Sequence, residues 1–221
     1  MTPDMDRVDL LCAYLDECLT LADVGCDHGY CTLTAFKSGK CKCAIISDVS
    51  AKCLAKAEKL LSQYISAGKC KAVVCDGLKD IPRSVDQALI AGMGGEEIIK
   101  ILKESFIPER FVLQPMKNAD KLRRFLIDSG CRIIKDDVFT DGKFFYFVIK
   151  GTRPRDGIAG VKESYTELEL KFGRDSLKNP LLKSYAEAEL KKRWGHLKGC
   201  TNRDTIKTIL HDISLYEEVL K

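Results

Sequence analysis

The sequence lacks the features of a membrane or secreted protein. It has no run of about 18 apolar residues, the length that a spanning helix needs. The N-terminal MTPDMDRVDLL is acidic and has no basic segment followed by an apolar one, as a secretory signal would have. Internal repeats and low-complexity segments are also missing. We therefore expect a cytoplasmic protein. Its 221 residues are enough for one full domain and an appendage.

Paired cysteines are missing too, although the chain has 11 cysteines. There is no C-x-x-C, and the three histidines, His28, His196 and His211, are distant in sequence from any cysteine pair. Structural zinc needs four converging ligands, usually in paired short spacings. We therefore expect buried, reduced thiols and no metal site.

Short apolar segments alternate with helical patterns over the first two thirds of the chain. The expected strands are 21–25, 43–48, 71–77, 87–95 and 110–115, and the expected helices are 50–68, 96–105 and 119–130. Asp141-Gly142 then marks a hairpin turn. Alternation of this kind predicts an α/β fold with a mostly parallel sheet, and the hairpin adds antiparallel strands at one edge. This is the layout of the Rossmann-like sheet of class I methyltransferases.

The pattern changes after Gly151. A linker at 151–157 precedes helical patterns without strands, in which Gly199 and Asn202 fit a helix end and a helix cap. We expect a main domain at 1–152 and a helical hairpin or coiled coil at 160–221. The tail carries most of the net charge of +4, which is compatible with a polyanionic partner but does not require one.

Three acidic residues stand at the ends of three successive expected strands. Asp23 begins D-x-G-x-x-x-G, which is not the G-x-G-x-x-G of dinucleotide sites. Asp48 is placed to accept hydrogen bonds from both hydroxyls of a ribose, and Asp76 is placed to accept one from the amino group of an adenine. The alternative is that all three acids only cap the following helices. Their joint placement at one sheet edge favours a nucleoside cofactor.

The fourth strand ends in AGMGGEE, at 91–97. Enzymes that methylate exocyclic amino groups of bases commonly carry Asn/Asp-Pro-Pro-aromatic here, and that motif is missing. Gly94 and Gly95 either leave room for a flat ligand near the backbone or simply begin the next helix.

The motifs DVGCDHGY, DGL (76–78), AGMGG (91–95) and LQP (113–115) resemble, in this order, the TrmK family. Those proteins are bacterial tRNA (adenine-22-N1)-methyltransferases that use S-adenosylmethionine. The resemblance covers about 7–150, and the family also has a helical tail. Gly29, Cys31 and Asp48 depart from the commoner family residues without removing a group that the cofactor needs.

The resemblance and the strand-end pattern together imply a set of site residues. S-adenosyl-L-methionine is expected to bind Asp23, Gly25, Cys26, Asp27, His28, Asp48, Val49, Asp76, Gly77, Leu78, Ala91, Gly92 and Met93. The RNA substrate is expected to contact Tyr30, Gln114, Pro115, Lys191, Lys192 and Arg193. Tyr30 could instead be a core residue, and the tail cations could be a solvated helix face.

Adenine N1 has an in-plane lone pair, so its methylation needs alignment more than a base. The product ring is positively charged, and Asp27 is our candidate for the carboxylate that stabilises it. His28 supports Asp27, touches the cofactor, or merely faces water.

Two other functions fit the sequence. One is a class I methyltransferase for a small molecule or a protein, and the other is a non-catalytic RNA-binding module. The favoured function predicts tRNA as the partner, without membrane or metal. The oligomeric state is left open, and a monomer is compatible with the sequence.

Overall fold

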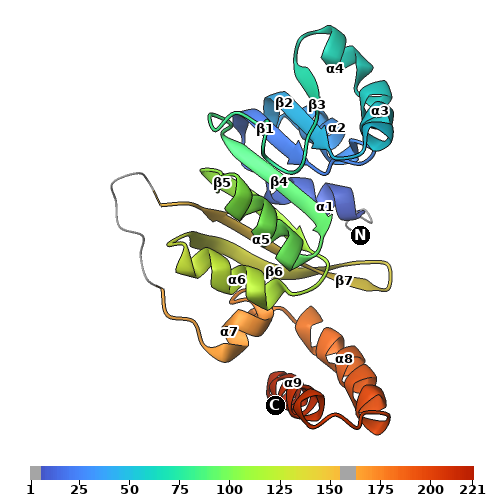
Figure 1. Cartoon of the computed structure of the whole chain (residues 1–221), viewed down its shortest axis with the longest axis vertical. Helices are drawn as coiled ribbons and strands as arrows, with labels where there is room; N and C mark the ends of the chain where they lie inside the picture. Colours follow the sequence, from blue (N-terminus) through green and yellow to red (C-terminus); the bar gives the residue numbers. More distant parts are fainter. Residues whose placement is uncertain (1–5, 155–162) are drawn as a thin grey trace.

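The computed structural model describes residues 6–154 and 163–221, and a single seven-stranded sheet organises the larger part (Figure 1). The strands are β1 (Cys18–Val24), β2 (Cys41–Asp48), β3 (Cys70–Val74), β4 (Gln87–Met93), β5 (Arg110–Pro115), β6 (Arg132–Asp141) and β7 (Phe144–Thr152). Their order in the sheet is β3-β2-β1-β4-β5-β7-β6. The first five strands pair in parallel, and β7 pairs antiparallel with both β5 and β6. The predicted fold class is confirmed.

Helices cover both faces of the sheet. They are α1 (Arg7–Tyr14), α2 (Tyr30–Lys37), α3 (Ala51–Leu60), α4 (Ser62–Ser66), α5 (Gly95–Glu104) and α6 (Ala119–Asp128). Leu89 of β4 packs with α1, α2 and α3, whereas the next residue, Ile90, packs with α5 and α6. Successive strand residues point to opposite faces, so a sheet covered on both sides has apolar residues at every position.

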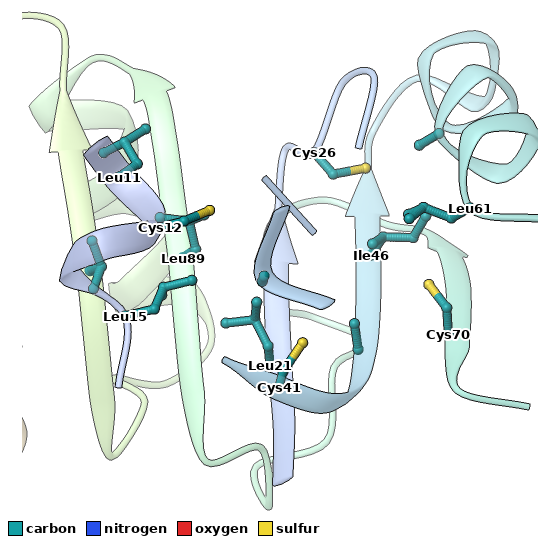
Figure 2. Close-up of a cluster of buried hydrophobic side chains, with 14 of the residues drawn as sticks. Leu11, Cys12, Leu15, Leu21, Cys26, Cys41, Ile46, Leu61, Cys70 and Leu89 are labelled. Atoms are coloured by element: carbon teal, nitrogen blue, oxygen red, sulfur yellow. The ribbon is translucent and has the colours of Figure 1, made fainter. Parts of the chain in front are cut away.

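The core on the face of α1 to α3 is rich in cysteine. Figure 2 shows Cys12, Cys26, Cys41 and Cys70 among leucine and isoleucine side chains. All 11 cysteines are free, and six are buried. Within the described residues, no group of three histidine, cysteine or acidic side chains could hold a metal ion.

Two helical segments differ from the sequence-based expectation. Helix α1 was not predicted, although Asp6 caps it by accepting from the N–H groups of Val8 and Asp9. The expected helix over 50–68 is interrupted at Leu61, between α3 and α4. Its predicted start is confirmed, because Ser50 caps α3 by accepting from the Cys53 N–H at 3.3 Å. None of the helices of 6–154 and 163–221 is long and apolar enough to cross a membrane.

The C-terminal helices pack beyond the hairpin edge of the sheet, at the opposite end from β3 (Figure 1). They are α7 (Glu167–Phe172), the short η1 (Ser176–Lys178), α8 (Leu181–Lys198) and α9 (Arg203–Leu220). Residues 199–202 connect α8 to α9, which pack against each other. Most of the predicted linker, and the start of the predicted tail at 160, lie outside the described residues.

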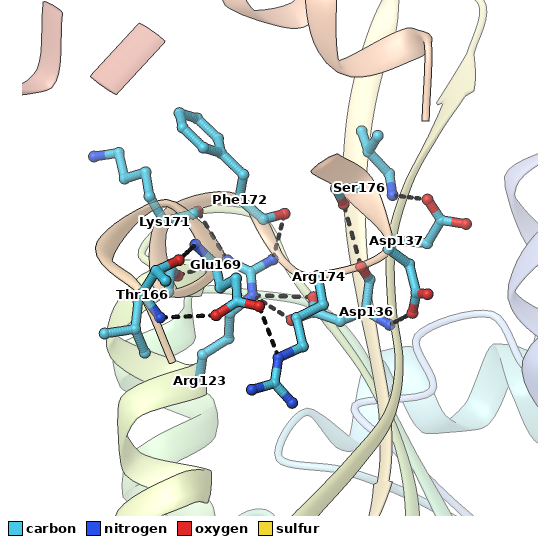
Figure 3. A network of polar contacts seen from close by, with 12 residues as sticks. Arg123, Asp136, Asp137, Thr166, Glu169, Lys171, Phe172, Arg174 and Ser176 are labelled. Atoms are coloured by element: carbon cyan, nitrogen blue, oxygen red, sulfur yellow. Dashed lines mark hydrogen bonds and ion pairs between the residues drawn. The ribbon is translucent and has the colours of Figure 1, made fainter. Parts of the chain in front are cut away.

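A buried arginine attaches these helices to the sheet. Arg123 of α6 donates to both carboxylate oxygens of Asp136 on β6, at 3.0 and 2.8 Å. It also donates to the carbonyls of Leu170, Lys171 and Phe172, which end α7 (Figure 3). Those carbonyls have no partner within the helix, since the last turn of any helix leaves its C=O groups free. Arg123 therefore joins α6, β6 and α7.

Candidate active site

A cavity of about 500 Å³ lies at the carboxyl ends of the parallel strands. β2 and β4 flank β1 on opposite sides, and ligands of parallel sheets bind where the strand order reverses in this way. Of the 13 predicted cofactor residues, all but Leu78 line it: Asp23, Gly25, Cys26, Asp27, His28, Asp48, Val49, Asp76, Gly77, Ala91, Gly92 and Met93. The side chain of Leu78 instead lies in the core beneath α5.

The loop after β1 has an unusual backbone. Gly25 has φ +68°, and a Cβ at this position would clash with Cε of Met93. Asp27 has φ 46°, in the left-handed region that residues other than glycine seldom adopt. Such conformations concentrate at ligand sites, where surrounding contacts hold them. Here the N–H of Asp27 donates to Oδ2 of Asp48 at 3.2 Å.

Asp23 is a buried carboxylate in the wall of the cavity. Asp23 is only 4% exposed, and its Oδ2 accepts a hydrogen bond from the Thr32 hydroxyl at 2.6 Å. Burial raises the pKa of Asp23 to about 6, the Thr32 hydrogen bond lowers it, and the nearby Asp48 raises it further. An ionised Asp23 therefore gains from a cation placed in the cavity.

Asp48 forms hydrogen bonds with the loop after β1 and with the start of α3, and it also lines the cavity. Its Oδ1 accepts from the N–H of Ser50, the residue that caps α3, at 2.8 Å, so Asp48 orders the start of α3 without capping the helix itself. A carboxylate has about four lone-pair positions. Positions therefore remain for hydroxyl groups of a ligand.

Asp27, His28 and Tyr30 form a partly exposed cluster beside the cavity. Nε2 of His28 lies 3.7 Å from Oδ2 of Asp27 and 3.4 Å from Nζ of Lys56. The rings of His28 and Tyr30 stack with centroids 5.8 Å apart. Tyr30 is 54% exposed, so it is not the core residue that the sequence left as an alternative. The Asp27 side chain is 64% exposed and can approach an incoming base.

The third strand end contributes Asp76, which receives a hydrogen bond from Nζ of Lys79 at 2.6 Å. This bond and the lysine charge hold the pKa of Asp76 below its usual value. The carboxylate therefore stays ionised and can accept from an amino group.

The two glycines after β4 lie against other residues of the chain and not against an open space for a ligand. A Cβ on Gly94 would lie 3.1 Å from Cε of Lys117, and one on Gly95 would clash with the backbone of Asn118. The Gly95 N–H donates to the carbonyl of Lys117 at 2.8 Å. Gly95 therefore allows close packing between the start of α5 and the start of α6, rather than access for a ligand.

Arg7 is a cavity residue that sequence reasoning missed. Its Nη2 donates to Oε1 of Gln114 at 2.7 Å, and its guanidinium lies 4.9 Å from the centre of the Tyr146 ring. Nε of Arg7 is buried and has no hydrogen-bond partner among the described residues. The available signal was the helix-capping pattern at Asp6, which would have placed Arg7 at the start of a helix.

The predicted substrate residues fall into separate places. Gln114 is fully buried, and its Oε1 also accepts from the N–H of Gly92 at 3.2 Å, so its role is to link Arg7 to β4. Pro115, Lys192 and Arg193 line a second cavity with the C-terminal helices. Lys191 is exposed and lines neither cavity.

Residues 5–149 match a family model described as a methyltransferase domain. The chain belongs to this methyltransferase domain family. Two proteins provisionally named tRNA methyltransferases, from Mycoplasma pneumoniae and Mycoplasma genitalium, are 33% identical to it over 132 and 135 residues. These matches cover 58% of this chain and 60% and 59% of the two proteins.

A relative aligns over nearly the whole chain. The Bacillus subtilis tRNA (adenine(22)-N(1))-methyltransferase is 25% identical over 219 residues, which cover 96% of this chain and 84% of that protein. The similarity to the TrmK proteins that the motifs indicated is thereby confirmed.

Solved structures show the same architecture. A Streptococcus agalactiae protein of the NADB-Rossmann superfamily superposes with a TM-score of 0.86 at 25% identity and 100% coverage of both chains. The M. capricolum TrmK structure, solved with S-adenosyl-homocysteine, gives 0.84 at 21% identity, with 97% and 98% covered. Both alignments include the C-terminal helices of this chain.

Proposed function

We propose that this protein transfers a methyl group from S-adenosylmethionine to N1 of an adenine in tRNA, at position 22 by its similarity to the TrmK proteins. One observation supports this most strongly: carboxylates from three neighbouring strand ends surround one cavity in a methyltransferase domain. The sequence relatives from Mycoplasma pneumoniae, Mycoplasma genitalium and Bacillus subtilis are all named for tRNA methylation. A tRNA substrate would place the protein's work in the cytoplasm.

The cavity fits the cofactor chemically. S-adenosylmethionine supplies an electrophilic methyl group on a sulfonium, and its amino acid part carries an ammonium and a carboxylate. Asp23 and Asp48 would favour the cationic groups, and Asp48 would accept from the ribose hydroxyls. Asp76 would accept from the adenine amino group. Gly25, whose Cβ would clash with Met93, allows the close approach of the backbone to the ligand.

Arg7 would bind the carboxylate of the cofactor. Its buried Nε is a charged donor without a described partner in the cavity wall, and such a donor is costly to leave unpaired. Arg7→Met should weaken S-adenosylmethionine binding by about 10- to 100-fold, because one charge-assisted hydrogen bond contributes about 1.5–3 kcal/mol. Calorimetry with 5′-methylthioadenosine, which lacks the amino acid part, is the control. An equal loss for both ligands would contradict this role.

Asp27 would stabilise the positive charge that develops on the methylated adenine. Its carboxylate is exposed beside the cavity, and its backbone is held in place by Asp48. Interactions that strengthen as charge develops lower the barrier rather than the ground-state energy. His28, 3.7 Å away, would position the carboxylate.

Asp27→Asn should therefore lower kcat by about 100-fold, the usual scale for one electrostatic contact to a transition state. The affinity for S-adenosylmethionine, measured by calorimetry, should change less than threefold. A collapse of cofactor affinity would instead make Asp27 part of the cofactor site.

The function itself is tested with unmodified tRNA transcripts and cofactor labelled in the methyl group. The expected product is N1-methyladenosine at position 22, located by the stop it causes in primer extension. A transcript with guanosine at position 22 is the matched control and should accept no label. Equal labelling of both transcripts, or none of either, would overturn the proposal. The adenine N1 lies on the Watson–Crick edge, so the base must be unpaired when it reacts.

A further inference from the structure

A second cavity, of about 520 Å³, lies beside the first on the same edge of the sheet. It is bounded by the connection from β5 to α6, by the tip of the β6–β7 hairpin, and by α8. The two cavities are neighbours, because the N–H of Met116, which lines the second, donates to the carbonyl of Met93, which lines the first, at 2.8 Å. An extended ligand in one could continue into the other.

The lining of the second cavity is strongly basic, with five cationic side chains and two acidic ones. Three of the cations form ion pairs with acidic residues of α8 and α9. Lys192 pairs with Glu189 of α8 at 2.5 Å. Lys171 and Arg193 both pair with Asp212 of α9, at 2.6 and 3.6 Å. Lys117 and Lys143 differ from these. Neither has a carboxylate oxygen within 4.0 Å among the described residues. Lys117 acts on Glu96 only from beyond that distance, where its charge helps to lower the pKa of Glu96, so both lysines can still contact an anion directly.

An exposed aromatic ring stands next to these lysines. Phe144 follows the hairpin turn and is 58% exposed, although hairpin tips usually carry polar residues. The aromatic residues behind it are already packed with one another, since Phe145 and Phe147 meet the Tyr185 ring edge-on at 5.6 and 5.2 Å. Phe144 stands at the rim with Nζ of Lys143 over its ring, 5.5 Å from the centre, and its other face is open to a partner.

We propose that the second cavity binds a nucleotide of the RNA other than the target adenine. Lys117 and Lys143 would contact its phosphate, and its base would stack on Phe144. This inference rests on the proposed function, because it treats the adjoining cavity as the place of methyl transfer. A phosphate between two cations and a base on an aromatic face is the general chemistry of single-stranded RNA recognition.

Three variants test this on the full chain: Lys117→Ala/Lys143→Ala, Phe144→Ala and Phe144→Tyr. Lys59→Ala is the control for charge, since Lys59 is an exposed lysine of α3 that lines neither cavity. The substituted residues are exposed at the cavity rim or in a surface loop, so folding should be retained, and unchanged S-adenosylmethionine affinity by calorimetry verifies it.

The double lysine variant and Phe144→Ala should each weaken tRNA binding about tenfold, whereas Phe144→Tyr and Lys59→Ala should stay within twofold of the unmodified chain. The slope of log affinity against log salt should fall by about 0.7 for each phosphate that the lysine variant no longer neutralises. Equal tRNA affinity of the lysine variant and Lys59→Ala would overturn the inference.

The two proposals fail in different ways. If the unmodified chain methylates tRNA but all variants bind it equally well, only the nucleotide site is wrong. If the chain binds tRNA without methylating it, and the lysine and Phe144→Ala variants lose binding, the nucleotide site is supported while the methyl-transfer proposal fails.

Discussion

Asp23→Asn is expected to raise the thermal stability of the protein and to weaken S-adenosylmethionine binding by at least tenfold. Both effects come from the burial of Asp23, whose pKa is raised from 3.8 to about 6. An ionised carboxylate in the wall of a cavity is unfavourable in the ligand-free protein. The same charge becomes favourable when a cationic ligand enters. The asparagine removes both contributions, and its carboxamide oxygen can still accept from Thr32.

The direction of the pH dependence follows from the raised pKa. Between about pH 4 and pH 6 the folded protein holds a proton on Asp23 that the unfolded chain has released, so the free energy of unfolding falls as pH rises through this interval. Above about pH 6 the full free-energy cost of burying the ionised Asp23 carboxylate is present. At pH 7 the variant should be more stable by about 3 kcal/mol, or roughly 9 °C in Tm.

Cofactor affinity should show the opposite trend. In the unmodified chain it should decrease as pH is lowered through about 6, where Asp23 becomes protonated, and in Asp23→Asn this component should be flat. Calorimetry at pH 5.5 and 7.5 measures the affinity, and thermal unfolding at the same two values measures the stability. Asp80→Asn, at an exposed position outside the cavity, is the matched control. A variant that binds cofactor normally at pH 7.5 would remove Asp23 from the site.

The strand ends could be predicted from the sequence because their signals are local. Asp23, Asp48 and Asp76 each follow a short apolar segment, and parallel strands bring their carboxyl ends to one edge. The hairpin was equally accessible, although its turn lies one residue later than the Asp141-Gly142 signal indicated. Asp141 still pairs with Phe144, and the turn residues are Gly142, with φ +55°, and Lys143.

The missed features depend on contacts between distant residues. Arg7 meets Gln114 across 107 positions, and neither residue predicts the other. The sequence could place Gln114 on a strand, but the expected contact between Gln114 and the RNA overlooked Arg7, from which its side chain accepts a hydrogen bond. The glycine pair had a similar limit: Gly94 and Gly95 indicate a close approach, whereas only the fold shows that Lys117 and Asn118 make it.

The contact that attaches the C-terminal helices to the sheet could not be predicted from the sequence either. Removing it should have a large effect on stability. Arg123→Ala should lower the free energy of unfolding by about 3–5 kcal/mol, because it leaves Asp136 as an uncompensated buried charge. It should also free the three carbonyls at the end of α7 (Figure 3). Arg123→Lys should recover only part of the loss, since an ammonium cannot match the planar fork of donors.

Arg124→Ala provides the matched control, because Arg124 is the exposed neighbour on the same helix. Thermal unfolding gives the stability, and limited proteolysis reports whether α7 has left the sheet. Lys171 of α7 lines the second cavity, so release of this helix should weaken tRNA binding. Cofactor affinity should persist in the folded protein, because the first cavity includes no residue of the C-terminal helices. If Arg123→Ala and Arg124→Ala unfolded at the same temperature and resisted protease equally, Arg123 would not be the attachment point of the tail.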